Sequence, residues 1–183
     1  MSLSIDDIEN IYTRRGHEQY TGEPVTMLEH ALQTAHLAEL EGADDALVTA
    51  ALLHDLGHLL HDISGTPSAD GIDDVHQFCV VPFLRGLFPD AVIDAIQRHV
   101  DAKRYLCAIE PAYHDTLSQD SKRSLLLQGG VYPSDQALAF IGEPGAPSAV
   151  RLRRWDDLAK QAGRETPPLS HFLQHMRRCA LSQ

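Results

Sequence analysis

The segment His54-Asp55-Leu56-Gly57-His58 constrains this chain more than any other feature of its sequence. It stands inside the apolar run VTAALLHDLGHLL (48–60), a pattern that favours a buried helix. On such a helix the two histidines are four residues apart, so both imidazoles can face one metal ion. Asp55 points about 100° away and can reach a second ion. The segment therefore predicts a metal site on a rigid helical element.

Further potential ligands fall on other predicted helices, at His30, His76, His99 and Asp156. A lone histidine on a helix is usually an ordinary packed or exposed side chain. Several of them beside a histidine–aspartate pair, on otherwise apolar helix faces, favour a metal centre. Imidazole suits iron, zinc, copper and nickel, whereas magnesium and calcium prefer oxygen. The remaining histidines are expected to be ordinary side chains and not metal ligands: His17, His36, His61, His114, His171 and His175. Among them, His36 and His61 are the best placed to contact a metal ligand and orient it.

The hydrophobic periodicity is helical nearly throughout, which predicts an all-α fold. Capping boxes at Ser4–Asp7 and Thr26–Glu29 predict the starts of the first two helices. A third helix is expected to end near Gly57. Later helices are expected at 74–88 (kinked or split by Pro82), 90–108, 119–128, 134–142, 148–162 and 169–181. We expect one domain over 1–183, a bundle of roughly eight to ten helices, with 1–25 as an N-terminal helix and lid segment packed on it.

The composition narrows the class of protein. Acidic residues outnumber basic ones 26 to 15, giving a net charge of −11 that repels nucleic acid. No stretch approaches the roughly 20 apolar residues of a membrane helix, and the first residues do not read as a signal peptide. Three cysteines stand far apart without a CxxC pair, which fits a reducing compartment. We therefore expect a cytoplasmic protein that binds neither nucleic acid nor membrane.

Several side chains suit an anionic ligand beside the metal site. Lys103 lies one helical turn after His99 on the same helix face. Ser121, Ser124 and Gln128 follow helical spacings and can line one wall with hydroxyl and amide donors. The alternative for this second group is a solvated helix face.

The order of histidines and aspartates resembles the HD-domain superfamily, and His58, His76 and His99 resemble its dinuclear subset. Within that subset the chain is similar to diiron oxygenases that cleave carbon–phosphorus bonds of hydroxylated aminoethylphosphonates, which are relatives of myo-inositol oxygenase. The resemblance covers nearly the whole chain. Its most discriminating motifs are His99-Val100-Asp101-Ala102-Lys103-Arg104-Tyr105-Leu106, Gln128-Gly129-Gly130 and Tyr20-Thr21-Gly22-Glu23.

The resemblance implies two iron ions in a mixed Fe(II)/Fe(III) state. It implies O2 and an (R)-1-hydroxy-2-(trimethylammonio or amino)ethylphosphonate as substrates, with phosphate and glycine betaine or glycine as products. The implied metal ligands are His30, His54, Asp55, His58, His76, His99 and Asp156.

By the same resemblance, Tyr20 occupies an iron position before substrate arrives and Glu23 meets the ammonium end of the substrate. The implied contacts to the phosphonate and its hydroxyl are Lys103, Ser121, Ser124, Gln128 and His58. The arginines at 151, 153 and 154 are expected to form a solvated or acid-paired face.

The segment 71–75 is more acidic than the glycine-rich, aromatic stretch typical of the enzymes for primary amines. Carboxylates and aromatic faces there would suit a trimethylammonium group. The trimethylammonio substrate is therefore slightly favoured, and the substrate with a free amine remains the alternative. The main rival is an HD phosphohydrolase acting on a nucleotide or phosphate monoester. A zinc peptidase is disfavoured because Asp55 is too short for the general base of HExxH. A catalytically dead regulatory module would lack ligands, and none is missing.

Overall fold

The computed structural model describes residues 2–20, 22–60 and 68–182. Thr21 of the predicted lid and His61 lie outside the described residues. Over the described ranges the chain forms helices and no β-strand, with only isolated bridges at Gln19–Thr26 and Arg85–Phe88. The prediction of an all-α fold is confirmed.

The helices are joined by connections of unequal length. In chain order they are α1 (Ile5–Arg15), α2 (Met27–Leu40), α3 (Asp45–Leu53), the 3-10 helix η1 (Leu56–Leu59), α4 (His76–Cys79), α5 (Val81–Leu84), α6 (Asp90–Ile109), α7 (Pro111–Thr116), α8 (Gln119–Leu127), α9 (Ser134–Ile141), α10 (Ala146–Leu158) and α11 (Leu169–Cys179).

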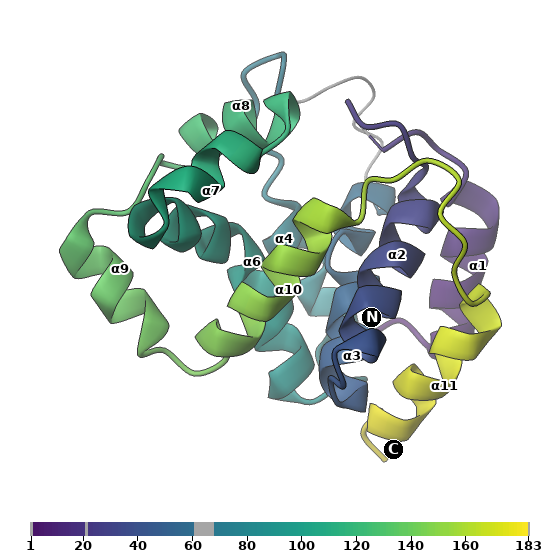
Figure 1. Ribbon diagram of the computed structural model, residues 1–183. Helices are drawn as coiled ribbons and strands as arrows, with labels where there is room; N and C mark the ends of the chain where they lie inside the picture. The colour runs from purple at the N-terminus through teal and green to yellow at the C-terminus, as the bar shows by residue number, and fades with distance from the viewer. Residues whose placement is uncertain (1, 21, 61–67, 183) are drawn as a thin grey trace.

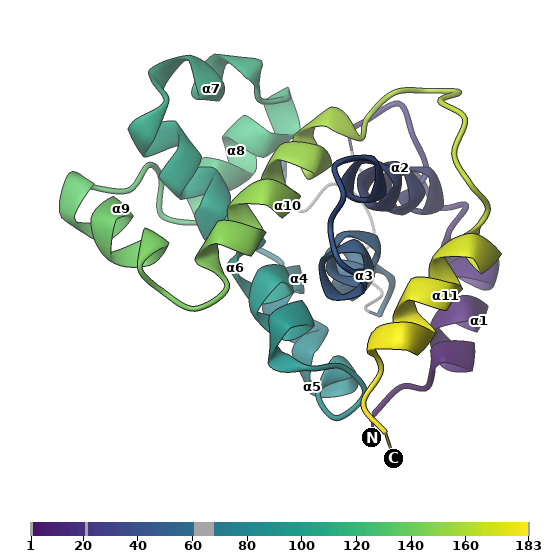
Figure 2. The same cartoon turned by 60° about the horizontal axis from the view of Figure 1, so that its bottom comes forward.

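Helix α3 lies at the centre of the bundle. Every residue from Leu47 to Leu53 is buried, as expected of a helix that is apolar on all sides. Helices α2, α6, α10 and α11 pack against it, and α10 also packs along α6 and α2 (Figure 1). Helices α7, α8 and α9 form a group on the far side of α6 with small apolar clusters of their own. At the opposite side α1 packs on α11, which brings the two chain ends together (Figure 2).

Local sequence signals explain several helix ends. The Ser4 and Thr26 side chains accept hydrogen bonds from the third helical residue of α1 and α2, and both capping boxes are complete. Pro82 stands in the first turn of α5, where its missing N–H does no harm, and it divides the predicted helix 74–88 into α4 and α5. Between the expected helices 90–108 and 119–128, where no helix is predicted, the chain forms the short helix α7, which begins at Pro111.

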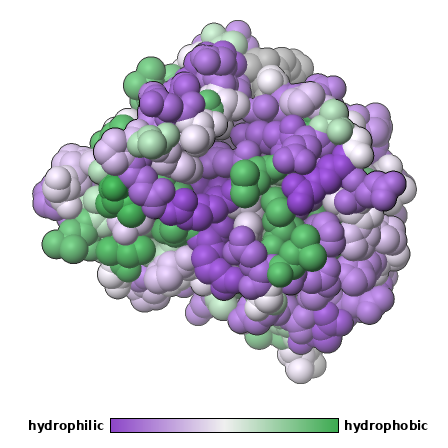
Figure 3. Space-filling view, viewed as in Figure 1, coloured by the Kyte–Doolittle hydropathy of each residue, from purple (hydrophilic) through white to green (hydrophobic). Residues whose placement is uncertain are grey.

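The viewed face of the molecule is mostly hydrophilic, with apolar patches over α9 and beside α10 (Figure 3). Within the described residues, none of the helices combines the length and the apolar character that crossing a bilayer requires.

Candidate metal centre

The His54–His58 segment does not form one continuous helix, and the prediction that both imidazoles face one ion is wrong. Helix α3 ends at Leu53, Asp55 has φ of −104° and ψ of 9°, and a 3-10 turn begins at Leu56. The tighter 3-10 winding, with about three residues per turn, rotates the second histidine away from the first. His54 consequently lies against α2 and α10, whereas His58 lies against the segment before α4.

One cluster of potential ligands joins α2, the end of α3 and α10. His30, His54 and Asp156 are buried, and each offers a ligand atom within 4.8 Å of the other two. The Nε2 atoms of the two histidines lie 3.2 Å apart. Asp156 Oδ1 lies 3.4 Å from Nε2 of His30. Three elements that are distant in sequence thus converge on one point.

A second cluster joins η1, α4 and α6. His76 and His99 are buried, with their Nε2 atoms 3.2 Å apart. Asp55 Oδ1 lies 3.2 Å from Nε2 of His76 and 3.6 Å from Nε2 of His99. Its other oxygen, Oδ2, lies 3.5 Å from His30 Nε2 and 3.4 Å from His54 Nε2. The Asp55 carboxylate therefore stands between two histidine pairs, one oxygen facing each.

The hydrogen bonds of the imidazoles fix which ring nitrogens are free. Nδ1 of His30, His54 and His99 lies 2.7–2.9 Å from a backbone carbonyl oxygen, which only a protonated nitrogen can approach. Where Nδ1 holds the only ring proton, Nε2 has the lone pair and faces the centre. His54 and His99 are kept neutral because burial lowers the pKa of each imidazole.

Two carboxylate oxygens at this centre have no hydrogen-bond partner within the described residues: Asp55 Oδ2 and Asp156 Oδ1. Buried lone pairs that converge without donors cost several kcal/mol each unless a cation lies between them. The donor set of imidazole nitrogens and carboxylate oxygens is the one that iron and zinc accept. The residues present therefore fit a pair of metal ions.

His58 and Asp74 form a third group with His76. Asp74 Oδ2 lies 2.9 Å from His58 Nδ1, and its Oδ1 lies 2.8 Å from His76 Nδ1. The ring of His58 stacks on that of His76 with centroids 4.1 Å apart, and its Nε2 is 3.8 Å from Asp55 Oδ1. Sequence reasoning noted Asp74 only as part of an acidic segment. Its position two residues before a predicted ligand was the available signal, since carboxylates commonly orient metal-binding histidines.

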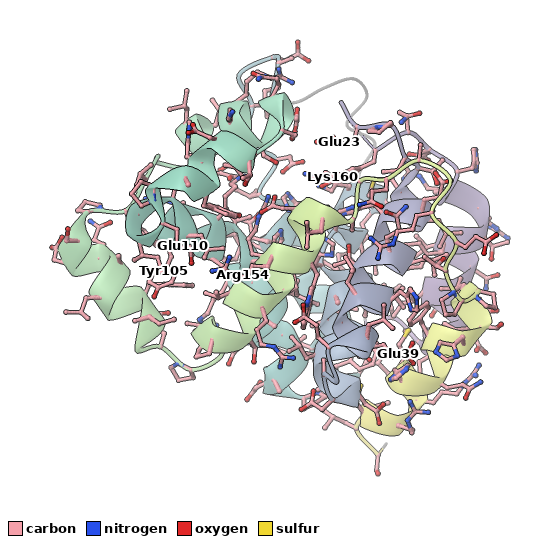
Figure 4. The ribbon with its side chains drawn as sticks, in the orientation of Figure 1. Glu23, Glu39, Tyr105, Glu110, Arg154 and Lys160 are labelled. Atoms are coloured by element: carbon pink, nitrogen blue, oxygen red, sulfur yellow. The ribbon has the colours of Figure 1, made fainter. Side chains whose placement is uncertain are left out.

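Arg153 is buried behind this centre rather than on a solvated face. The residue is 4% exposed, and its guanidinium pairs with Asp156 Oδ2 at 2.8 Å and with the Asp157 carboxylate. Burial opposes ionisation of Asp156, but the charge of Arg153 outweighs it and holds the pKa of that carboxyl below its usual range. The carboxylate is thus ionised and oriented. The neighbouring arginines differ, because Arg151 lies over the Trp155 ring and Arg154 pairs with Glu110 (Figure 4).

A cavity of about 340 Å³ opens beside the two clusters. Lys103 is 2% exposed, lines this cavity and donates a hydrogen bond to Ser124 Oγ at 2.8 Å. Ser121 and Gln128 line the same wall, and Gln128 Oε1 has no hydrogen-bond partner among the described atoms. The structure thus brings all four expected phosphonate contacts to one side of the cavity. The opposite side is formed by the metal-site residues.

Tyr20 covers the cavity near α2. Its ring stacks on His30 with centroids 4.1 Å apart, and burial together with the nearby charge of Asp55 raises the pKa of its phenol. Glu23 lies further out, where its Oε1 is 3.4 Å from Lys160 Nζ (Figure 4). Lys160 also lies 3.3 Å from Ser121 Oγ. Sequence reasoning missed this lysine, which follows the end of α10 four residues after the predicted ligand Asp156. That spacing, the same as between His99 and Lys103, was the available signal.

The model of the HD domain matches residues 27–139 of this chain. The chain belongs to the HD domain family. Members of this family hold metal through histidines and aspartates, and the clusters around Asp55 supply such groups here. Asp156 lies beyond the matched residues.

Relatives with names of their own match most of the length of this chain. A 1-hydroxy-2-(trimethylamino)ethylphosphonate dioxygenase (glycine-betaine-forming) from Leisingera caerulea is 39% identical over 168 residues, 92% of this chain and 86% of the relative. A hydroxymethylphosphonate dioxygenase from Gimesia maris is 40% identical over 163 residues, 88% of this chain and 81% of the relative. An uncharacterized protein of Acanthamoeba polyphaga mimivirus is 31% identical over 172 residues.

Proposed function

We propose that this chain is an iron-dependent oxygenase that uses O2 to cleave the carbon–phosphorus bond of a 1-hydroxyphosphonate. The observation that carries the proposal is the Asp55 carboxylate between two buried histidine pairs, at the edge of a cavity that contains the buried Lys103. Two relatives that share about 40% of their residues with this chain are named as phosphonate dioxygenases. In the net reaction one O2 is consumed, and each of the products, phosphate and a carboxylate, gains one oxygen atom.

In this proposal His30, His54 and Asp156 would hold one iron and His76 and His99 the other, and Asp55 would offer one carboxylate oxygen to each. A mixed-valent Fe(II)/Fe(III) pair would supply the oxidising chemistry with O2. His58 is assigned to the substrate rather than to iron, because its ring stacks outside His76 and it is partly exposed to the cavity. Asp74 on Nδ1 leaves Nε2 of His58 free to hold the proton of the substrate hydroxyl.

Lys103, Ser121, Ser124 and Gln128 are proposed to bind the phosphonate, since charge-assisted hydrogen bonds suit a near-dianion. Lys103 lies on α6 one turn beyond His99, so the phosphonate would be held next to the second iron. Tyr20 is proposed to cover the iron site at His30 until substrate displaces the tyrosine. The stacking of its ring on the His30 imidazole supports this role.

The cavity is also lined by Asp73, Asp74 and Ile72. Carboxylates beside an apolar side chain suit a trimethylammonium group, which is a large and weakly hydrated cation. We therefore favour the trimethylammonio substrate over the primary amine. Glu23, expected to meet the ammonium end, instead has Lys160 as its neighbour, so its contact with substrate would require that pair to separate.

The experiment is anaerobic iron loading followed by electron paramagnetic resonance, with and without each candidate substrate, and then a phosphate assay in O2. The candidates are the trimethylammonio, amino and unsubstituted hydroxymethyl phosphonates. We expect a mixed-valent signal that changes on substrate addition, phosphate release that requires O2, and the highest kcat/KM for the trimethylammonio compound. Rapid hydrolysis of a nucleotide or phosphate ester without O2 would instead identify the phosphohydrolase.

A further inference from the structure

A second group of potential metal ligands lies far from the cavity, between the C-terminal helix and the bundle. His171 and His175 stand four residues apart on α11, and Glu39 stands near the end of α2 (Figure 4). Glu39 Oε1 lies 2.7 Å from Nε2 of His171 and 3.1 Å from Nε2 of His175. The three ligand atoms lie within 4.8 Å of one another. Histidines at this spacing on a helix present both rings to one point.

The ring of His175 is held by a second carboxylate. Its Nδ1 lies 2.7 Å from Asp45 Oδ1 and 3.0 Å from Nη2 of Arg178. The contact with Asp45 is a hydrogen bond when Nδ1 carries the ring proton. Arg178 in turn binds both oxygens of Asp45, at 2.8 and 2.7 Å, and keeps the carboxylate in place. A carboxylate on the outer nitrogen of an imidazole is the usual support of a metal-binding histidine, because it fixes the tautomer and the ring orientation.

His175 Nε2 lies 3.1 Å from Glu39 Oε1. When Nδ1 holds the only ring proton, the Nε2 lone pair points at this carboxylate oxygen. Two lone pairs at this distance repel unless a cation separates them. A further observation concerns His36, whose Nδ1 is buried, lies 3.7 Å from Glu39 Oε2 and has no hydrogen-bond partner among the described atoms. Four side chains thus direct nitrogen or oxygen atoms at one small region.

We propose that Glu39, His171 and His175 bind one divalent ion of the zinc, nickel or copper class, separate from the buried pair. In a tetrahedral site with bonds of about 2.0–2.1 Å, neighbouring ligand atoms stand about 3.3 Å apart. The two separations from Glu39 Oε1, 2.7 and 3.1 Å, would lengthen slightly, and the ligand atoms of the two histidines lie within 4.8 Å of each other. The His171 side chain is 39% exposed and that of Glu39 31%, so water or a fourth side chain can complete the shell. The ion would tie α11 to α2.

The alternative to a metal ion is a second proton on His175. The charged imidazole would then form an ion-pair network with the neighbouring carboxylates. The proton and the metal ion are distinguished by titration of the iron-loaded protein with Zn(II). The zinc isotherm and the iron and zinc contents are then measured together. We expect one further equivalent of zinc without loss of iron. His171→Ala and Glu39→Gln should each weaken this equivalent by at least tenfold, while iron content and phosphate release stay unchanged.

The matched control is His114→Ala, which removes an exposed histidine on α7 and should leave zinc binding unchanged. As a second readout, Co(II) added in place of zinc should give the intense visible absorption of a tetrahedral ion, and His171→Ala should abolish it. Circular dichroism checks that each variant keeps the helical fold. The proposal is overturned if no zinc binds beyond the buried centre, or if zinc binds His171→Ala as tightly as His114→Ala.

Discussion

Lys103 is a buried cation whose hydrogen-bond partner, Ser124, carries no charge. Burial is the main cause that lowers the pKa of Lys103 to about 7, and the nearby Arg153 acts in the same direction. A free lysine has its pKa near 10.5. The position of this side chain in the folded protein therefore disfavours its charged form. A bound anionic ligand would favour the charged form instead.

Replacing Lys103 by methionine should stabilise the fold and weaken phosphonate binding. Because the pKa is lowered from 10.5 to about 7, the unfolded chain binds the extra proton between these pH values. Stability therefore falls as pH drops through this window, and the cost is complete below pH 7. Lys103→Met should raise the free energy of unfolding by about 2–4 kcal/mol at pH 6 and by much less at pH 10.

Urea unfolding at the two pH values measures this effect, and isothermal calorimetry should record phosphonate binding weaker by about 1.5–3 kcal/mol. Arg104→Met is the control, because Arg104 lies on the same helix and donates to the carbonyls of Gly129 and Gly130 rather than lining the cavity. An equal loss of stability at both pH values in Lys103→Met would contradict the assignment.

At the scale of elements, the contact of η1 with α4 positions both metal clusters. A Cβ added at Gly57 would overlap the carbonyl oxygen of His76, and its nearest neighbours are backbone atoms of that residue. Only glycine lets the turn after Asp55 approach the helix that begins with His76. Val75, just before this helix, has a φ of +46°, an uncommon conformation for a β-branched residue that further indicates a constrained approach.

Gly57→Ala should push α4 away and separate His76 from Asp55. We expect a loss of about 1–3 kcal/mol in the free energy of unfolding and purified protein with less than two metal ions per chain. Chemical denaturation and metal analysis measure these two quantities. Gly142→Ala is the matched control, because Gly142 has a φ of −81° and an added Cβ there has its nearest neighbour at 3.4 Å. Normal metal content in Gly57→Ala would show that the contact is not needed.

Helix positions and caps were predictable from the sequence because they depend on local patterns, as at Ser4, Thr26 and Pro82. The end of α3 was not, since VTAALLHDLGHLL continues a helical pattern through Gly57, and the 3-10 turn arises from the contact with His76. Asp74 and Lys160 stand close in the sequence to predicted ligands. Which atoms they contact, however, depends on how the chain folds. The lid role of Tyr20 and the extent of the domain over 1–183 stay predictions.

At the scale of the whole molecule, the metal centre joins segments that are far apart in the chain. The histidine and aspartate side chains come from α2, the α3–η1 junction, α4, α6 and α10, and span His30 to Asp156. Without ions, the buried oxygens of Asp55 and Asp156 would repel each other. Metal binding and folding should therefore be thermodynamically linked.

Removal of the metal should destabilise the entire fold rather than one helix. At a free metal concentration about 1,000 times the Kd, binding adds about 4 kcal/mol to the free energy of unfolding. Chelation under reducing conditions should remove at least this amount and lower Tm, as followed by circular dichroism at 222 nm. His54→Ala should begin with the lower Tm and respond little to chelator. A chelated wild type with unchanged Tm would contradict the linkage.

The basic side chains Lys103, Arg153 and Lys160 are recessed in a protein of net charge −11. A phosphonate approaching through solvent first meets the repulsive outer field and meets these cations only at contact. The Debye length shortens from about 30 Å at 0.01 M salt to about 10 Å at 0.1 M, which weakens the outer field while buried pairs are screened much less. Diffusional encounter should thus quicken as potassium chloride is added, and kcat/KM should rise before it levels off. An enzyme steered by its surface charge would show the reverse dependence on ionic strength.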